Sequence, residues 1–237
     1  MIWWLLLAAL PALGQTARQP WPPPIKDNPA LHSIIFDQLE GRITGPDPTF
    51  RWDAEGWFGT NNNKLWIKSE GDVTAGKMSD GDHEALYDRP IPHLRYLDWQ
   101  AGVRVDADSG TTRTWGAVGI GGLVPYFFKI APTFYFRDGG VAGRLEGSYN
   151  LYITQRWILQ PQIELNFYSK RDPARGIGTG LSDLDGGVRL GYQISRKFAP
   201  YVGFTYTSTY GETATFARRG GQLSHDSRLV LGIWVWR

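Results

Sequence analysis

The chain of 237 residues contains no cysteine, which excludes disulfides, thiolate metal sites and cysteine nucleophiles. It has two methionines and four histidines, so the soft thioether and imidazole ligands of metal sites are scarce. Its longest apolar run, Ile2 to Leu10, is far shorter than the roughly 20 residues that a transmembrane helix requires. The net charge is only +2 and the basic residues are dispersed, which argues against nucleic-acid binding.

The amino-terminal residues are typical of an exported protein. The apolar run is followed by the small residues Ala12 and Gly14, which predicts a signal peptide over residues 1–14, although no Lys or Arg precedes the run. Residues 15–29 contain five prolines, which favour an extended, polyproline-like path, and we interpret them as a periplasmic tether. Residues 30–237 remain as one folded unit.

The stretch from Arg144 to Lys170 shows strand periodicity on both sides of a short turn at residues 154–156. Each run is about ten residues long, enough for a tilted strand to span a bilayer, whereas strands of soluble sandwiches usually stop after about 5 to 6 residues. Aromatic residues such as Trp157 and Phe167 lie near the ends of the apolar face, as they do in the interfacial girdles of transmembrane barrels. The stretch therefore predicts a hairpin of a transmembrane β-barrel.

The rest of the chain extends this pattern to about twelve strands, an even number, as single-chain bacterial barrels require. The predicted fold class is all-β, an antiparallel outer-membrane β-barrel. The predicted strands are Leu31–Ile43, Phe50–Gly59, Lys64–Glu70, His83–Arg89, Tyr96–Asp106, Thr114–Leu123, Phe127–Arg137, Arg144–Ile153, Trp157–Tyr168, Asp183–Ile194, Ala199–Tyr210 and Arg228–Trp236.

The lengths of the connections support a membrane barrel. If both termini are periplasmic, the long loops Gly71–Asp82, Arg171–Ser182 and Gly211–Asp226 fall on the extracellular side, and short turns such as Asn61–Asn63 fall on the periplasmic side. Outer-membrane barrels show this asymmetry. A soluble lipocalin-like barrel has no reason to follow it, and its apolar faces would point inward.

The chain also contains a set of distinctive segments: Phe36–Glu40, Trp52–Trp57, Leu65–Gly71, Gln100–Arg104, Thr154–Pro161, Gly176–Asp183, Phe198–Tyr201 and Phe216–Arg218. Together these segments resemble the copper resistance protein B family, and the resemblance covers nearly all of residues 28–237. The family is an outer-membrane component of bacterial copper-resistance operons. The resemblance implies a non-enzymatic role in copper homeostasis, in which the barrel binds or conducts copper ions and a periplasmic copper-binding protein is a possible partner beside the outer-membrane lipids.

Two departures limit what is carried over from the family. Members often have a Met- and His-rich segment before the barrel, which suits Cu(I). Here the proline-rich tether takes that place, and Met78 is the only methionine after the predicted signal. The chain also finishes on Trp236-Arg237, whereas a barrel protein normally ends on an aromatic residue.

Register identifies one candidate site in the lumen. With the turn centred on Gln155, Glu146 and Glu164 become direct cross-strand partners, with Cβ atoms roughly 4.5 to 5.5 Å apart. Arg144 lies diagonally from Glu164 and neutralises the pair in the structural interpretation. In the functional alternative the pair holds a hard divalent cation such as Cu(II), and a retaining-glycosidase pair has similar spacing but needs room for a sugar.

The remaining candidates come from side-chain parity along the strands, except His32, which is chosen because it lies at the predicted periplasmic mouth beside the tether. Inward acids and inward bases balance, which predicts a salt-bridge lattice that narrows or plugs the lumen. The candidate metal residues are Glu146, Glu164, Asp98, Asp185 and His32, and the structural lumen charges are Arg144, Arg104 and Arg189.

Two other functions stay open. A general diffusion channel for small solutes is the alternative from the same class. A lipid hydrolase is the alternative from another class, because His225 and Ser227 lie two residues apart on one strand face. An orienting third group and an oxyanion hole are also required for hydrolysis, and the neighbouring residues identify neither.

Overall fold

The computed structural model describes residues 28–44, 47–94, 96–107 and 112–237. The predicted signal peptide, nearly all of the tether and most of the connection at residues 107–112 lie outside the described residues. Within the described part, no helix has the length and apolar character needed to cross a membrane.

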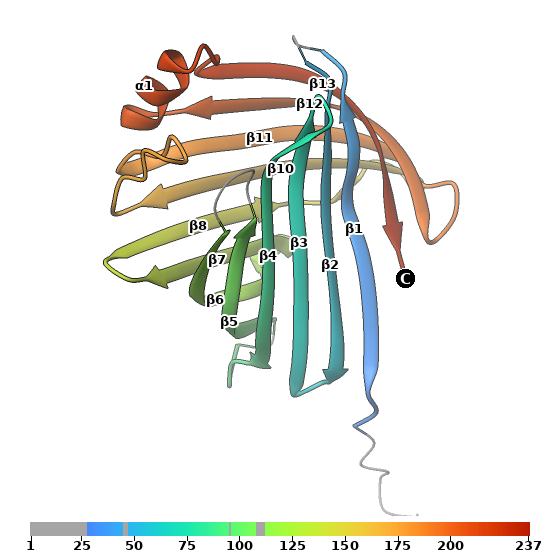
Figure 1. Cartoon of the computed structure of the whole chain (residues 1–237). Helices are drawn as coiled ribbons and strands as arrows, with labels where there is room; N and C mark the ends of the chain where they lie inside the picture. Colours follow the sequence, from blue (N-terminus) through green and yellow to red (C-terminus); the bar gives the residue numbers. More distant parts are fainter. Residues whose placement is uncertain (1–27, 45–46, 95, 108–111) are drawn as a thin grey trace, which may run out of the picture.

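The sheet closes on itself as a twelve-strand antiparallel barrel, because β1 pairs with both β2 and β13 while β11 pairs with both β10 and β12 (Figure 1). The predicted strand number is therefore confirmed, with the two-residue β9 continuing β8. The elements are β1 (Leu31–Arg42), β2 (Thr49–Thr60), β3 (Asn63–Thr74), β4 (Lys77–Pro90), β5 (Leu97–Ala107), β6 (Thr112–Val124), the 3-10 turn η1 (Pro125–Phe127), β7 (Phe128–Arg137), β8 (Gly140–Ser148), β9 (Leu151–Tyr152), β10 (Trp157–Tyr168), β11 (Gly180–Tyr192), β12 (Phe198–Thr209), α1 (Gly211–Arg219) and β13 (His225–Trp236).

The two faces of the sheet differ as the alternation predicts. Apolar side chains cover the outside, for example Leu145 and Ile163, which are 42% and 43% exposed. Charged side chains on the same strands, such as Arg144 and Glu164, are buried in the lumen. An apolar exterior around a polar interior is the arrangement of a barrel in lipid. We call the end that carries the turn at residues 61–62 the base, and the end that carries α1 the top.

The predicted hairpin has the predicted register but one interruption. Glu164 faces Glu146 and Ile158 faces Tyr152, so both halves keep the same pairing. Between them the first strand breaks at Tyr149 and Asn150 instead of running on to residue 153. Pro161 is the residue opposite Tyr149; it accepts a hydrogen bond from Tyr149 N but has no N–H to return, so the ladder is interrupted there.

The prediction of a long loop over Gly71–Asp82 was wrong. β3 continues to Thr74, β4 begins at Lys77, and the connection is a tight turn. Ala75 and Gly76 both have positive φ, 49° and 77°, as a two-residue hairpin turn of the favoured hand requires. These strand ends consist mostly of polar residues, so the alternation of apolar and polar residues that marks a strand is missing there. A strand that extends beyond the membrane needs no apolar face.

The predicted loop Gly211–Asp226 is also only partly a loop, because it contains helix α1. Thr213 in this helix accepts a hydrogen bond from Gly178 N at 2.8 Å, and its hydroxyl lies 3.1 Å from that of Ser182. These bonds hold α1 against the segment that precedes β11, so the top of the barrel is partly covered.

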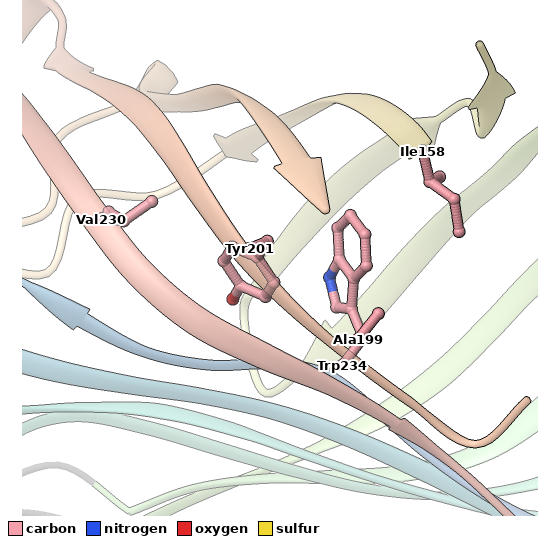
Figure 2. Close-up of a cluster of buried hydrophobic side chains, with 5 residues drawn as sticks. All are labelled: Ile158, Ala199, Tyr201, Val230 and Trp234. Carbon is pink, nitrogen blue, oxygen red and sulfur yellow. The ribbon is translucent and has the colours of Figure 1, made fainter. Parts of the chain in front are cut away.

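An apolar cluster lies on the lumenal side of β10, β12 and β13 at the base (Figure 2). Trp234 is only 2% exposed, and its ring lies 4.7 Å from that of Tyr201. The neighbouring strands leave room for these rings through glycines, since a Cβ at Gly191 would lie 2.1 Å from Trp234. The cluster consists of Ile158, Ala199, Tyr201, Val230 and Trp234, with Trp236 packed against it.

Candidate functional site

Arg144 is the centre of the charged lattice in the lumen. Its guanidinium lies 2.5 Å from Glu70 Oε1 and 2.6 Å from Asp82 Oδ2. It also lies 3.4 Å from Glu164 Oε1 and 3.7 Å from Glu146 Oε1. One buried cation thus contacts carboxylates from four strands, β3, β4, β8 and β10, and the predicted glutamate pair shares it with Glu70 and Asp82.

A second cluster of ion pairs joins β1 to β11 and β12. Glu40 is fully buried and accepts two hydrogen bonds from Arg189, at 2.8 and 2.9 Å, and one from Tyr201 Oη at 2.9 Å. Arg42 contacts Glu40 at 3.4 Å and Asp185 at 3.2 Å. The two bonds between Arg189 and Glu40 form a bidentate pair, which is the strongest form of an arginine–carboxylate contact.

Arg104 forms a third cluster, with ion pairs to Asp82 at 2.5 Å and to Asp106 at 2.6 Å. Its guanidinium also stacks 4.6 Å from the centre of the Tyr135 ring. The predicted lattice around Arg104, Arg144 and Arg189 is therefore present. Because these buried side chains project into the lumen, they narrow it in the described part of the chain.

Three cavities follow one another along the lumen. The upper cavity, about 520 Å³, lies beneath α1 and residues 174–177. The lower cavity, about 50 Å³, shares Glu70, Asp82 and Arg144 with the upper one. The base cavity, about 270 Å³, shares Asp37 and Gln160 with the lower one. The cavities therefore form a chain with two constrictions, each made of the polar side chains that two cavities share.

The lower cavity is acidic, whereas the upper cavity is balanced. Seven carboxylates and three cations line the lower cavity, while six of each line the upper one. A cation entering from the top would therefore meet increasing negative charge toward the centre of the barrel. The residues lining the lower cavity with charge are Asp37, Asp53, Glu55, Glu70, Asp82, Glu84 and Glu146 against Lys68, Lys129 and Arg144.

The structure pairs Glu146 with Glu164, as the register predicts, and places Asp185 opposite Glu164 on the next strand. The three carboxylates nevertheless do not share a cavity. Glu146 lines the lower cavity, whereas Glu164 and Asp185 line the upper one, with Arg144 bordering both.

The other two candidate residues lie elsewhere. Asp98 contacts Lys64 at 2.5 Å near the base and lines none of the three cavities. His32 is exposed and pairs with Phe58, whose side chain is 62% exposed, so it lies on the outer face. Across the part of the chain that the structure describes, no three His, Asp or Glu side chains converge to hold a metal ion directly.

Sequence reasoning missed Glu84 and Asp53 as residues of the lumen site. Glu84 is 5% exposed and accepts a hydrogen bond from Tyr135 Oη at 2.6 Å. The signal was present in the alternation of Asp82, Glu84 and Leu86 with outward residues, but a charged strand without an apolar face is weakly marked. Glu84 and Asp53 line the same cavity because their strands face each other across the barrel, and the alternation of residues along one strand does not reveal which strands do so.

Sequence comparison relates the chain to one family. A family model described as copper resistance protein B precursor matches residues 30–236. The chain is 37% identical over 213 residues to copper resistance protein B of Escherichia coli, covering 90% of this chain and 71% of that protein. It is 38% identical to a copper resistance protein B homolog of Pseudomonas syringae pv. tomato, with 90% and 72% covered.

Solved structures with a similar fold are outer-membrane porins. The NanC porin superposes with a TM-score of 0.53 at 13% identity, covering 86% of this chain and 99% of that one. The KdgM porin superposes with a TM-score of 0.50 at 14% identity, covering 86% and 98%. At these identities the likeness concerns the fold alone, and together with the family match it places the chain in the outer membrane.

Proposed function

The chain belongs to the copper resistance protein B family, and we propose that this outer-membrane barrel serves copper homeostasis by holding or conducting copper ions in its lumen. The observation that carries the proposal is the chain of three cavities, whose central member is lined by seven carboxylates. A lumen of this kind admits a small cation more readily than a neutral solute. A periplasmic copper-binding protein is the proposed partner at the base.

The side chains that line the cavities favour Cu(II) over Cu(I). Carboxylate, amide and hydroxyl oxygens suit a hard divalent ion, whereas Cu(I) prefers thioether and imidazole ligands. Neither histidine nor methionine lines any of the three cavities in the described part of the chain. The residues of the lumen are therefore better suited to carry copper as Cu(II) than as Cu(I).

Deleting the gene is expected to make its host more sensitive to copper and to change total cell copper. The wild-type chain should restore tolerance when supplied on a plasmid. Growth across a copper series, with cell copper measured by elemental analysis, provides the test. Normal tolerance and normal copper content in the deletion strain would contradict the proposal.

The Ser227→Ala variant separates this function from lipid hydrolysis. The hydroxyl that contacts His225 Nδ1 is that of Ser224, at 3.4 Å, whereas Ser227 pairs with Tyr206 of the neighbouring strand β12. We expect Ser227→Ala to restore copper tolerance as fully as the wild type. Loss of a lipase activity in this variant, with copper tolerance untouched in the deletion strain, would support the enzyme instead.

A swelling assay distinguishes the copper function from a general diffusion channel. Proteoliposomes that contain the wild-type barrel are expected to exclude neutral sugars, because the lumenal arginines and carboxylates fill the space between the cavities. Liposomes that contain a known general porin are the positive control. Rapid swelling in a monosaccharide, together with a conductance that copper does not alter, would favour the general channel.

A further inference from the structure

The lower cavity contains acceptor oxygens that no donor satisfies. Glu84 Oε2, Asp82 Oδ1 and Gln160 Oε1 are buried and have no hydrogen-bond partner in the structure. The three side chains are 5%, 3% and 8% exposed, and all three line this cavity. An unsatisfied buried acceptor costs roughly 1–3 kcal/mol, and more when it carries charge, so three at one cavity indicate a missing donor.

The charge around the cavity is also incomplete. Arg51 and Arg104 reach Glu70 and Asp82 from outside the lining, at 3.7 and 2.5 Å. Adding these two to the three lining cations leaves seven carboxylates facing five positive charges. Arg51 and Arg104 also contact Asp72, Glu164 and Asp106 outside the lining, so carboxylates outnumber the cations around this cavity. Among the described residues, no cationic side chain lies within 4 Å of Glu84.

The size of the cavity decides how an ion is held. A volume of about 50 Å³ for water-sized spheres exceeds the roughly 10–15 Å³ that one water needs. The carboxylates do not converge closely enough to ligate a bare ion. By that measure the cavity holds about three to five waters, so an ion that keeps only part of its water shell fits both observations. A small rotation of the side chains would let its waters donate to the unsatisfied oxygens, while the excess of carboxylates holds the ion in place.

We propose that the lower cavity is a binding site for one hydrated divalent cation, held through water by Glu84, Asp82, Glu146 and Gln160. Glu146 contributes charge from β8, opposite the β4 carboxylates, and in the described part of the chain its one ion pair within 4 Å is the 3.7 Å contact with Arg144. That copper is the physiological ion rests on the proposed function; the binding itself does not.

Lys68 makes the site testable in two directions. Lys68 lines the cavity and has no ion pair within 4 Å among the described residues, and Glu146, Glu84 and Glu55 are the carboxylates that act on it most strongly. Its positive charge competes with a bound cation for the same field. Removing a carboxylate should therefore weaken binding, whereas removing the lysine should strengthen it.

Equilibrium dialysis of the purified full chain against Mn²⁺, which prefers oxygen ligands, measures the site. We expect one saturable Mn²⁺ per chain, displaced by Cu²⁺, which binds oxygen and nitrogen sites more tightly. Glu84→Gln and Glu146→Gln should each weaken binding at least about tenfold, and Lys68→Met should tighten it several-fold. Asp226→Asn, whose carboxylate lines none of the three cavities, is the matched control and should bind as the wild type does.

Heat-modifiable gel mobility verifies that each variant is a folded barrel, and two separate glutamine variants keep the test valid if one fails to fold. The proposal is overturned if the wild type shows no saturable Mn²⁺ binding, or if neither Glu84→Gln nor Glu146→Gln weakens it. The outcomes also separate the two proposals. Carboxylate-dependent binding in a protein whose deletion leaves copper tolerance normal retains the site and rejects the function, and the reverse result rejects only the site.

Discussion

Replacing Arg144 with methionine should destabilise the barrel more than any other single change in the lumen. The change leaves Glu70 and Asp82 without their shared partner at 2.5 and 2.6 Å, and removes a cation from Glu146 and Glu164. Breaking a buried ion pair by removing one partner costs about 3–5 kcal/mol. Urea titration of the folded barrel in lipid vesicles, followed by gel mobility, measures the loss.

Two further variants show whether the geometry of Arg144 matters. Arg144→Lys keeps one positive charge but replaces a planar fork with a point charge, so we expect an intermediate stability. Lys197→Met removes a cation from an exposed turn and should have little effect. Equal stability of Arg144→Met and Lys197→Met would show that the contacts of Arg144 with its four carboxylates do not hold the barrel together.

Glu40→Met is the second change for which we expect a large effect. It leaves Arg189, which is 1% exposed, without its bidentate partner, and deprives Tyr201 of its acceptor. We expect a loss of about 3–5 kcal/mol in the same urea titration. Gln38, on the neighbouring inward position, provides the matched control: Gln38→Met removes a neutral group, so it should cost less.

The double variant Glu40→Met with Arg189→Met tests the origin of that loss. Replacing both partners of a buried ion pair by apolar residues of similar volume is often neutral, because no charge is left unpaired. Arg42 keeps its contact with Asp185 at 3.2 Å in the double variant. The double variant should therefore recover most of the stability. A double variant as unstable as Glu40→Met alone would locate the loss in packing rather than in charge.

The fold was predictable because the bilayer restricts a strand in two ways. Length and period are both dictated by the solvent, so runs such as Trp157–Tyr168 are recognisable without a homologue. Register was predictable where a short turn fixes it, which is why Glu146 was placed opposite Glu164 correctly. Helix α1 was not predicted, because a nine-residue helix at the loop end is held by contacts such as Thr213 with Gly178 rather than by its own pattern.

The site was less predictable, because it depends on which strands face each other across the lumen. Arg51 on β2 reaches Glu164 on β10 at 3.6 Å, and that distance follows from barrel closure and strand tilt, which local patterns do not encode. His32 shows a second limit. Counting parity back from Glu40 would place it in the lumen, but the irregularity in pairing between Phe36 and Gln38 reverses the faces and turns it outward.

The seam between β1 and β13 has a consequence for how the barrel assembles. These strands lie at opposite ends of the barrel sequence, and they pair only in two short stretches, at residues 35–36 and 40–42 of β1. Every other neighbouring pair is joined by a connection of modest length, so closing the seam costs the largest loop-closure entropy, and we expect it to form last. Until then both strand edges are open to pairing with other chains. Glu40 completes its bonds to Arg189 and Tyr201 only when the edges meet, so the final step joins backbone pairing and lumenal ion pairing in one cooperative event.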